Sequence, residues 1–461
     1  MTPPPTPPSH SRTGAFAVVT SLFFIWGFIT SINDILVVQF RNAFTLTQFQ
    51  AQLVQSAFFG AYFVASTLYF AISVTKGDPI ARIGYRRGVV LGLVIAAVGT
   101  ALFWPAASFV SYGWFLAGLF VLGLGLAMLQ IAANPYVTLL GPEASAAGRL
   151  NLAQGFNSLG TVIGPSLAGR WILPRLEQAG AFSTESVRLP FAAFCGVFVA
   201  LALIFSFIHL PDVGEEKVER GAGALKMPHV VLGIVAIFMY VGGEVSIGSE
   251  VLNFLHQPQI AGLTAGEGKF FVSLFWGGLM IGRFIASVEL SAMAKTKKWL
   301  LVAAIPVAAW IFLCLYKDIH IADAYAPLLI ACWALFQLGA AMPARTLGLF
   351  ALAVSALMVA AMFLTGHAAM WCVVGAGLFS SIGWTNTFPL ALEGTGNFKS
   401  QASSLLVVGV LGGALLPPLQ GKISDHTSLQ FSFIVPALAY LYVSFYGWKG
   451  CRVGRGPVPP A

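Results

Sequence analysis

Runs of about twenty or more mostly apolar residues follow one another along almost the whole chain of 461 residues. A run of that length crosses the hydrocarbon core of a bilayer as an α-helix. Hydrophobic residues make up 57% of the sequence and charged residues only 9%, so a water-soluble fold would expose far too much apolar surface. The expected fold class is therefore an all-α polytopic membrane protein, since a helix satisfies its own backbone polar groups in lipid.

The apolar runs predict about fourteen spans, in a group of six and a group of eight. One long charged segment, 211–228, separates the two groups and is the expected cytoplasmic linker. It divides the chain into a Pro-rich, disordered tail (1–13), an N-terminal six-helix bundle (14–210), a C-terminal bundle (229–448) and a second tail (449–461). The spans are predicted near 14–40, 51–74, 88–108, 111–140, 149–172, 190–210, 229–256, 268–290, 299–316, 325–341, 345–365, 368–391, 400–420 and 427–447.

The distribution of Lys and Arg residues agrees with the predicted spans. If the N-terminus is cytoplasmic, 17 of the 25 Lys and Arg residues fall on the cytoplasmic side, as the positive-inside rule requires. Both termini are then cytoplasmic, and the net charge of +8 is a signal of topology that calls for no nucleic-acid partner. The tail at the start lacks the features of a cleaved signal peptide, so the first span is expected to be retained.

An internal repeat links the two groups of spans. GLGLAMLQIAANPY begins at Gly123 and GAGLFSSIGWTNTF at Gly375, and each places an asparagine nine residues after its second glycine: Asn134 and Asn386. The segments 160–169 and 412–421 share the spacing G-x4-P-x3-G in the same order. Parallel repeats of this kind build transporters whose substrate site lies between the halves near the middle of the membrane.

The first span carries a carboxylate inside an apolar run. Gly27, Thr30, Ser31 and Asp34 are spaced to share one helical face. Intramembrane carboxylates mark ion or substrate paths, and Asp34 could take a proton or hold Na⁺. The alternative is a structural carboxylate that bonds a neighbouring helix or lies near the hydrated surface.

Amide side chains mark the fourth and fifth spans. Gln130 and Asn134 lie on one face of the fourth span, and Gln154 and Asn157 on one face of the fifth. Amides both donate and accept hydrogen bonds, which matches sugar hydroxyls. The alternative is polar contact between helices, which we favour for Asn134 because the next residue, Pro135, leaves a backbone group in need of a partner.

The second group of spans adds further candidates. Glu244 lies centrally in IFMYVGGEVSIGSEVLNFL beside a Gly-Gly pair, and either a coupling or a structural role is open to it. Arg283 could be the counter-ion of such a carboxylate or lie near an interface. Trp384 could stack on a sugar ring, although most tryptophans in membrane proteins lie at interfaces. Asn386, the counterpart of Asn134 in the repeat, is a further candidate sugar contact.

Several kinds of chemistry have no motif in the sequence. It contains no nucleophile elbow, no phosphate-binding Gly-rich loop with Lys and no HExxH, so an enzyme and an ATP-driven pump are not expected. The five scattered cysteines predict neither a disulfide framework nor a metal site. No cofactor is expected, and any driving force would come from an ion gradient or from the solute itself.

At these residues the sequence resembles a known family. FFIWGFITSINDIL, GDPIARIGYRRGVVLGL, LQIAANPYVTLLGPE, RLNLAQGFNSLGT and YVGGEVSIGS are similar to segments of the fucose/glucose-galactose permeases, hexose–cation symporters of the major facilitator superfamily. The residues in and around LQIAANPYV and NSLGTVIGP are more similar to those of the glucose/galactose branch than to those of the fucose branch. The resemblance implies two pseudo-symmetric six-helix bundles. It also implies a segment of about 48 residues inserted as a helical hairpin at about 295–342.

The resemblance also assigns roles. Asp34 matches a coupling aspartate of the fucose permeases, and Gln154 and Asn157 match sugar contacts. Gln130 stands where those permeases have a coupling glutamate, and Thr30 and Ser31 replace a pair of asparagines. These departures leave open whether the coupling ion is H⁺ or Na⁺, and Glu244 could take over the ionic role.

The resulting expectation is a monomeric symporter of glucose or galactose in the inner membrane of a bacterium, surrounded by lipid. A permease or exporter for another solute, such as fucose, is an alternative on the same scaffold. A sugar receptor that does not transport is a further alternative from a different class.

Overall fold

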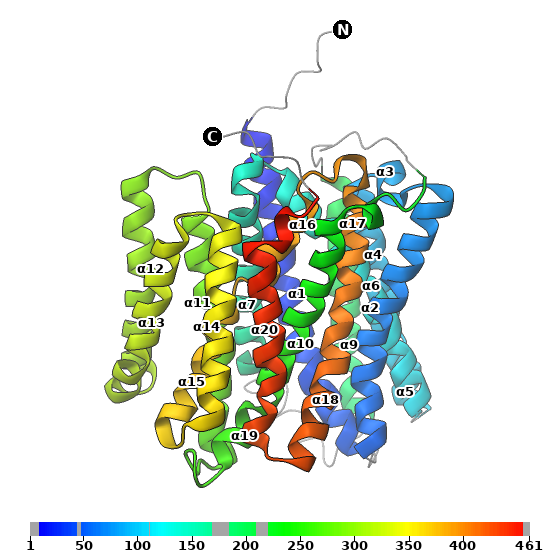
Figure 1. The fold of residues 1–461 in the computed structure, drawn as a ribbon. Coiled ribbons are helices and arrows are strands. Elements are labelled where there is room, and N and C mark those ends of the chain that lie inside the picture. The colour runs from blue at the N-terminus through cyan, green and yellow to red at the C-terminus, as the bar shows by residue number, and fades with distance from the viewer. Residues whose placement is uncertain (1–8, 44–47, 110, 168–183, 209–219, 455–461) are drawn as a thin grey trace. The chain divides into compact units, whose positions relative to one another are not determined.

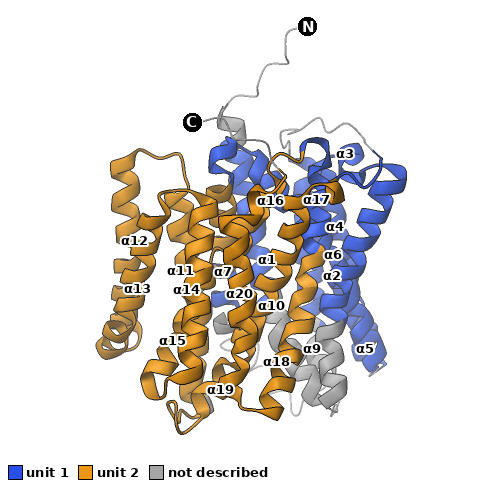
Figure 2. Cartoon of the chain, viewed as in Figure 1, with its two compact units in different colours: residues 1–146, 159–223, 396–407 blue, residues 147–158, 224–395, 408–461 orange. Residues whose placement is uncertain are grey.

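The computed structural model describes residues 9–43, 48–109, 111–167, 184–208 and 220–454, and all the regular elements in them are helices (Figure 1). Within these ranges the side chains of residues 9–12, 30, 32–43, 48–56, 165–167, 184–187 and 189–190 lie outside the description. The chain divides into two compact units (Figure 2). The first unit comprises residues 1–146, 159–223 and 396–407, and the second comprises residues 147–158, 224–395 and 408–461.

The first unit is built from long apolar helices. They are α1 (Ser9–Ala43), α2 (Gln48–Lys76), the short α3 (Pro79–Ile83), α4 (Tyr85–Ala101) with α5 (Phe103–Ser108), α6 (Tyr112–Leu139), the second part of α7 (Ala146–Leu167), α9 (Thr184–Phe207) and most of α17 (Lys399–Val408). Within this unit α4 packs against α6 and α9.

Small residues allow α4 and α6 to approach closely. A Cβ on Gly92 would lie 2.9 Å from Leu129, and one on Gly99 would meet the backbone of Leu122. Membrane helices associate through such small residues because lipid supplies no hydrophobic force between them.

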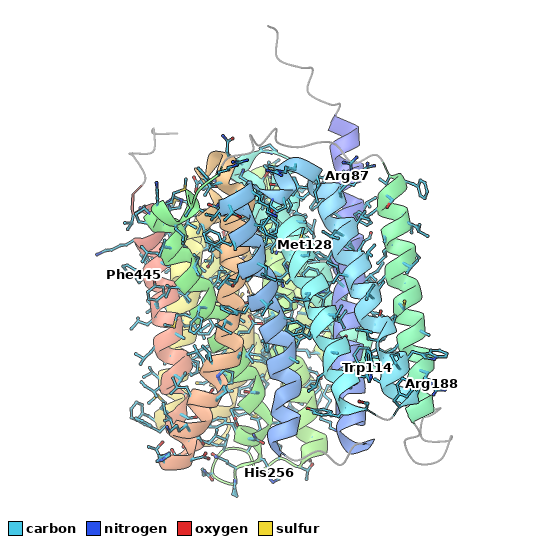
Figure 3. All side chains as sticks on the ribbon, turned by 90° about the vertical axis from the view of Figure 1, so that its right-hand side faces the viewer. Arg87, Trp114, Met128, Arg188, His256 and Phe445 are labelled. Carbon is cyan, nitrogen blue, oxygen red and sulfur yellow. The ribbon has the colours of Figure 1, made fainter. Side chains whose placement is uncertain are left out.

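Polar contacts fasten α9 to the end of α5. Arg188, labelled in Figure 3, donates from Nη2 to Ser108 Oγ at 3.0 Å, and its guanidinium carbon lies 5.6 Å from the ring centre of Trp104. The helix end is therefore held by both a hydrogen bond and a cation–π contact.

The second unit contains more helices. They are the first part of α7, α10 (Pro228–His256), α11 (Ala265–Glu289), α12 (Lys295–Tyr316), α13 (Ile319–Gly339), α14 (Pro343–Phe363), α15 (Gly366–Ser380), α16 (Gly383–Leu392), α18 (Gly412–His426), α19 (Leu429–Ser432) and α20 (Ile434–Trp448). Here α10 packs against α18 and α20, and α11 against α15.

The predicted span at 368–391 is interrupted near its middle. The sequence predicts a single span at 368–391, and the structure ends α15 at Ser380 and begins α16 at Gly383. The residues between the two helices are Ser381 and Ile382, both fully buried. Irregular backbone at membrane depth is tolerated where it is buried in protein, so this break places polar backbone inside the unit.

Eleven helices of the described residues are long and apolar enough to cross a membrane, and two shorter apolar helices occupy 13–29 and 191–207. The count of fourteen spans stays a prediction. The segment expected as an inserted hairpin forms two neighbouring helices, α12 and α13 (Figure 1). That these helices are an addition to the family's fold also stays a prediction.

The bounds of the two units differ from those of the two predicted bundles in two segments. Residues 147–158, expected in the N-terminal bundle, belong to the second unit, and residues 396–407, expected in the C-terminal bundle, belong to the first. The change from one unit to the other at residues 223–224 falls inside the predicted linker. The predicted domain boundaries stay a prediction.

Candidate functional site

The first part of α7 brings its amide side chains into the second unit by packing on α11. Gly148 faces the backbone oxygens of Ser287 and Leu290, and Gly155 faces the ring of Phe284. Phe156 adds an edge-to-face contact with Phe284, with ring centres 5.7 Å apart. Glycines seven residues apart leave one face of α7 free of side chains, so the two helix backbones lie close together.

A cluster of amides joins α7 to α16. Asn151 donates from Nδ2 to Asn386 Oδ1 at 3.0 Å and accepts at Oδ1 from Thr385 Oγ1 at 2.7 Å. Asn386 in turn donates from Nδ2 to the carbonyl oxygen of Pro343 at 3.1 Å. All three polar side chains are fully buried. The cluster therefore satisfies its own hydrogen bonds, and it uses both the oxygen and the nitrogen of the Asn386 amide.

Arg283 on α11 connects α7 to the break between α15 and α16. Its Nε donates to the carbonyl oxygen of Ser381 at 3.1 Å, and its Nη1 donates to Ser158 Oγ on α7. The Ser158 hydroxyl donates onward to the carbonyl oxygen of Gln154 at 3.0 Å. Arg283 is only 9% exposed. A buried cation is therefore held by neutral oxygens from two different elements.

Glu244 on α10 lies near this cation. It is half-buried, and it interacts electrostatically with Arg283 and with the hydroxyls of Tyr240 and Tyr440. In the described part of the chain no hydrogen bond joins Glu244 to Arg283. The Tyr440 hydroxyl donates to Ser380 Oγ at 2.9 Å, and the Tyr240 hydroxyl makes no hydrogen bond of normal length there. A carboxyl group inside the unit thus has a cation and two phenols as its charged or titratable neighbours.

The predicted sugar contacts of the second unit lie on α7 and α16. Gln154 is 9% exposed, and Asn157, half-buried, already has an interaction partner. The Trp384 ring stacks on Phe388 with centres 5.4 Å apart, and its buried indole N–H has no acceptor among the described residues. The structure therefore brings two amide-bearing α7 residues and one tryptophan into the same unit as Glu244 and Arg283.

The remaining predicted residues belong to the first unit. Gln130 on α6 is half-buried, and its buried Oε1 accepts no hydrogen bond from the residues that the structure describes. Ser31 is buried and donates to the carbonyl oxygen of Phe28 at 3.0 Å. The side chains of Thr30 and Asp34 fall outside the described residues, so the roles predicted for them stay predictions.

Asn134 differs from the expectation of a contact between helices. It is fully buried, and among the described residues neither its Oδ1 nor its Nδ2 has a hydrogen-bond partner. The carbonyl oxygen of Ile131, which Pro135 deprives of its helical donor, accepts instead from Ser403 Oγ at 3.1 Å. The backbone requirement was foreseen correctly, and the residue that meets it was not. Unpartnered buried polar atoms are rare and often belong to functional sites.

Sequence reasoning missed several polar residues of the second unit. Ser381 and Thr385 carry contacts of Arg283 and Asn151, but single hydroxyl residues in apolar helices are common and gave no signal. The run SSIG at 380–383 was a usable signal for the break, since Gly and Ser weaken helices. Within the described part of the chain, no group of three or more His, Cys, Asp or Glu could hold a metal ion, and the five cysteines are free.

Residues 14–347 match the model of the Major Facilitator Superfamily. The chain belongs to this superfamily. The predicted resemblance to the fucose/glucose-galactose permeases is confirmed by individual relatives of this major facilitator protein.

A glucose/galactose transporter of Brucella abortus is 38% identical over 97% of this chain and 98% of its own. An L-fucose-proton symporter of Escherichia coli is 29% identical over 95% of this chain and 93% of its own. A crystal structure of a variant of the E. coli fucose:proton symporter superposes with a TM-score of 0.76 at 27% identity. The match covers 95% of this chain and 99% of that one.

Proposed function

We propose that this major facilitator protein is a cation-coupled symporter that imports a hexose, glucose or galactose, by alternating access. The observation that carries the proposal is the 38% identity to a glucose/galactose transporter over nearly the full length of both chains. Buried amide side chains suited to sugar hydroxyls support it. The proposed location is a bacterial inner membrane, with both termini in the cytoplasm and the protein acting as a monomer.

In this mechanism the polar residues have different roles in binding the sugar. Gln154 and Asn157 on α7 and Gln130 on α6 hydrogen-bond the sugar, and Trp384 stacks on its ring. Gln130 and Trp384 each offer a buried polar atom without a partner in the described part of the protein. Sugar hydroxyls would complete these hydrogen bonds, which would offset the free energy that such atoms lose on leaving water.

The coupling cation, H⁺ or Na⁺, binds at Asp34, with Glu244 as a second candidate. A carboxylate inside the membrane is expensive to bury while charged. Binding a cation neutralises it and so favours closure of the protein around the occupied site. The two repeats then rock about that site to expose it on the other side.

Fucose is a second candidate substrate, because an L-fucose-proton symporter matches 95% of the chain at 29% identity. Thr30, Ser31 and Gln130 argue against it, since each departs from the fucose-permease pattern.

Counterflow in proteoliposomes tests the proposal. Purified protein is preloaded with one unlabelled sugar, and entry of labelled glucose, galactose or fucose is followed. Glucose or galactose should exchange, and the preferred sugar should accumulate under an imposed ion gradient. Failure of all three sugars to exchange would contradict the proposed function.

A further inference from the structure

Of the two carboxyl groups proposed for coupling, only that of Glu244 is described with its neighbours. Glu244 on α10 faces Arg283 on α11, Tyr240 one turn away on its own helix, and Tyr440 on α20. Arg283 is the only cation among these three neighbours. The phenols of Tyr240 and Tyr440 and the guanidinium of Arg283 therefore determine which cation can bind at this carboxyl group.

A sodium ion fits this neighbourhood poorly. Na⁺ at Glu244 would put a second positive charge beside a buried guanidinium, where repulsion is much stronger than in water. The nearby backbone oxygen at the helix break, that of Ser381, already accepts a hydrogen bond from Arg283 Nε at 3.1 Å. A proton removes the charge of the carboxylate and needs no further oxygen ligands.

The hydrogen bonds of Arg283 bear on the charge of the Glu244 carboxyl group. An ionised Glu244 would attract the guanidinium more strongly than neutral oxygens do, because charge-assisted hydrogen bonds are roughly twice as strong as neutral ones. In this structure Arg283 donates instead to the Ser381 carbonyl and the Ser158 hydroxyl. This arrangement agrees with a neutral Glu244, which would not compete for the guanidinium.

We propose that Glu244 takes up the coupling proton and that Arg283 transmits its charge state to α7. Ionisation of Glu244 draws Arg283 away from Ser158, and protonation returns it. Ser158 is next to Asn157 in the chain, and its hydroxyl bonds the carbonyl of Gln154. The proton and the sugar therefore communicate through α7 without touching each other. This inference rests on the proposed function, and it makes Arg283 a positioning residue.

Proteoliposomes test the inference with two carboxyl variants on the same helix. Glu244→Gln should lower proton-driven sugar accumulation about tenfold, a typical coupling between two sites, while counterflow stays close to that of the unaltered protein. Glu250→Gln is the matched control, since Glu250 is half-buried six residues along α10 and bonds Asn253 at 2.9 Å. It should keep both activities. Loss of counterflow and accumulation together in Glu244→Gln would assign Glu244 a purely structural role and overturn the inference.

Two further variants test the link to α7. Ser158→Ala removes the acceptor of Arg283 on α7, and Arg283→Lys replaces a fork of donors with a single point charge. Both should lose accumulation and keep counterflow. Normal accumulation in Ser158→Ala would disprove transmission through α7. Accumulation that follows a sodium gradient and disappears in Glu244→Gln would replace the proton by Na⁺ and overturn the inference.

An infrared measurement separates this inference from the proposed function. Protein in detergent without sugar should show the C=O stretch of a protonated carboxylic acid, which Glu244→Gln removes and Glu250→Gln retains. If no sugar is transported but this difference is present, the function fails and the protonation of Glu244 stands. If the spectra of the protein and Glu244→Gln are identical, the inference fails whatever the sugar result. Should Glu244→Gln not fold, Glu244→Asp must keep the band and the coupling.

Discussion

The side-chain amide nitrogen of Asn151 on α7 is 3.0 Å from the side-chain carbonyl oxygen of Asn386 on α16, and Thr385 returns a hydrogen bond of 2.7 Å to Asn151. These residues are far apart in the sequence and fully buried. Every polar atom lost from such a closed cluster leaves another one unpartnered, and this costs about 1–3 kcal/mol.

Replacement of Asn151 by alanine should therefore destabilise the protein by about 1–3 kcal/mol, because Thr385 and Asn386 each lose a partner. Thermal unfolding in detergent measures the change. Asn253→Ala is the control, since its amide bonds Glu250 on an exposed face. An unfolding temperature for Asn151→Ala equal to that of the control would mean that the cluster adds no stability.

The two asparagines of the repeat should respond oppositely to substitution by leucine. Asn386→Leu removes hydrogen bonds to Asn151 and Pro343, so its unfolding temperature should fall. Asn134→Leu removes an amide with no partner in the described residues, so its unfolding temperature should stay equal or rise. A clear loss of stability in Asn134→Leu would show that its amide does bond something in the folded state.

Asp78 should make stability depend on pH. It caps α3 and accepts from the Tyr69 hydroxyl at 2.6 Å and the Ile80 amide at 2.9 Å. Burial nevertheless raises the pKa of its carboxyl group above the ordinary value, against these hydrogen bonds, which lower it. The folded state thus binds the proton more tightly. The stabilisation is complete below the unfolded pKa and is lost as pH rises through the folded pKa.

The comparison with Asp78→Asn measures this effect, because asparagine keeps the cap but does not titrate in this range. The stability of the unaltered protein relative to Asp78→Asn should fall as pH rises through the acidic range. Asp425→Asn, at an exposed position, is the control for removal of a carboxylate. A relative stability that rises with pH would mean that the hydrogen bonds outweigh burial.

Asp34→Asn tests the first-span carboxylate. If Asp34 holds the coupling cation, the variant should lose accumulation about tenfold and keep counterflow. Sodium and proton gradients are imposed separately, and the one that drives the unaltered protein identifies the ion. Normal accumulation in Asp34→Asn under either gradient would make Asp34 structural and leave Glu244 as the coupling residue.

Gln154→Ala should weaken sugar binding, since it removes hydrogen bonds to hydroxyl groups worth about 1 kcal/mol each, or roughly fivefold in affinity. The half-saturation concentration of counterflow measures this loss, and the maximal rate should change less. Asn253→Ala again serves as the control. An unchanged half-saturation concentration would remove Gln154 from the sugar site.

Apolar length predicted most helices of the fold well. The spans predicted at 111–140, 229–256 and 345–365 correspond to α6, α10 and α14 within two residues at each end. The break between α15 and α16 was not predicted, because apolar length alone does not reveal the effect of the short run SSIG at 380–383. The segments 147–158 and 396–407 were assigned to their sequence neighbours, and only three-dimensional packing groups them otherwise.

For the site, the sequence indicated which residues are unusual in apolar helices. It did not indicate which residues they bond. Glu244 and Arg283 stood out as charges in apolar helices, and their proximity was one of two alternatives left open. The partners that Arg283 actually has, Ser158 and Ser381, lie more than ninety residues away on either side. A pattern of neighbours in sequence carries no information about such distant contacts.

The difference in hydrogen bonding between Asn134 and Asn386 bears on the evolution of the internal repeat. Two copies of one ancestral half would begin with the same asparagine in the same surroundings. One copy now holds its amide in a closed network, and the other has no partner for it among the described residues. We expect the duplicated position to be constrained by hydrogen bonding in one half and free of that constraint in the other. In a library of random variants, the first repeat should therefore accept substitutions at this position that the second repeat rejects.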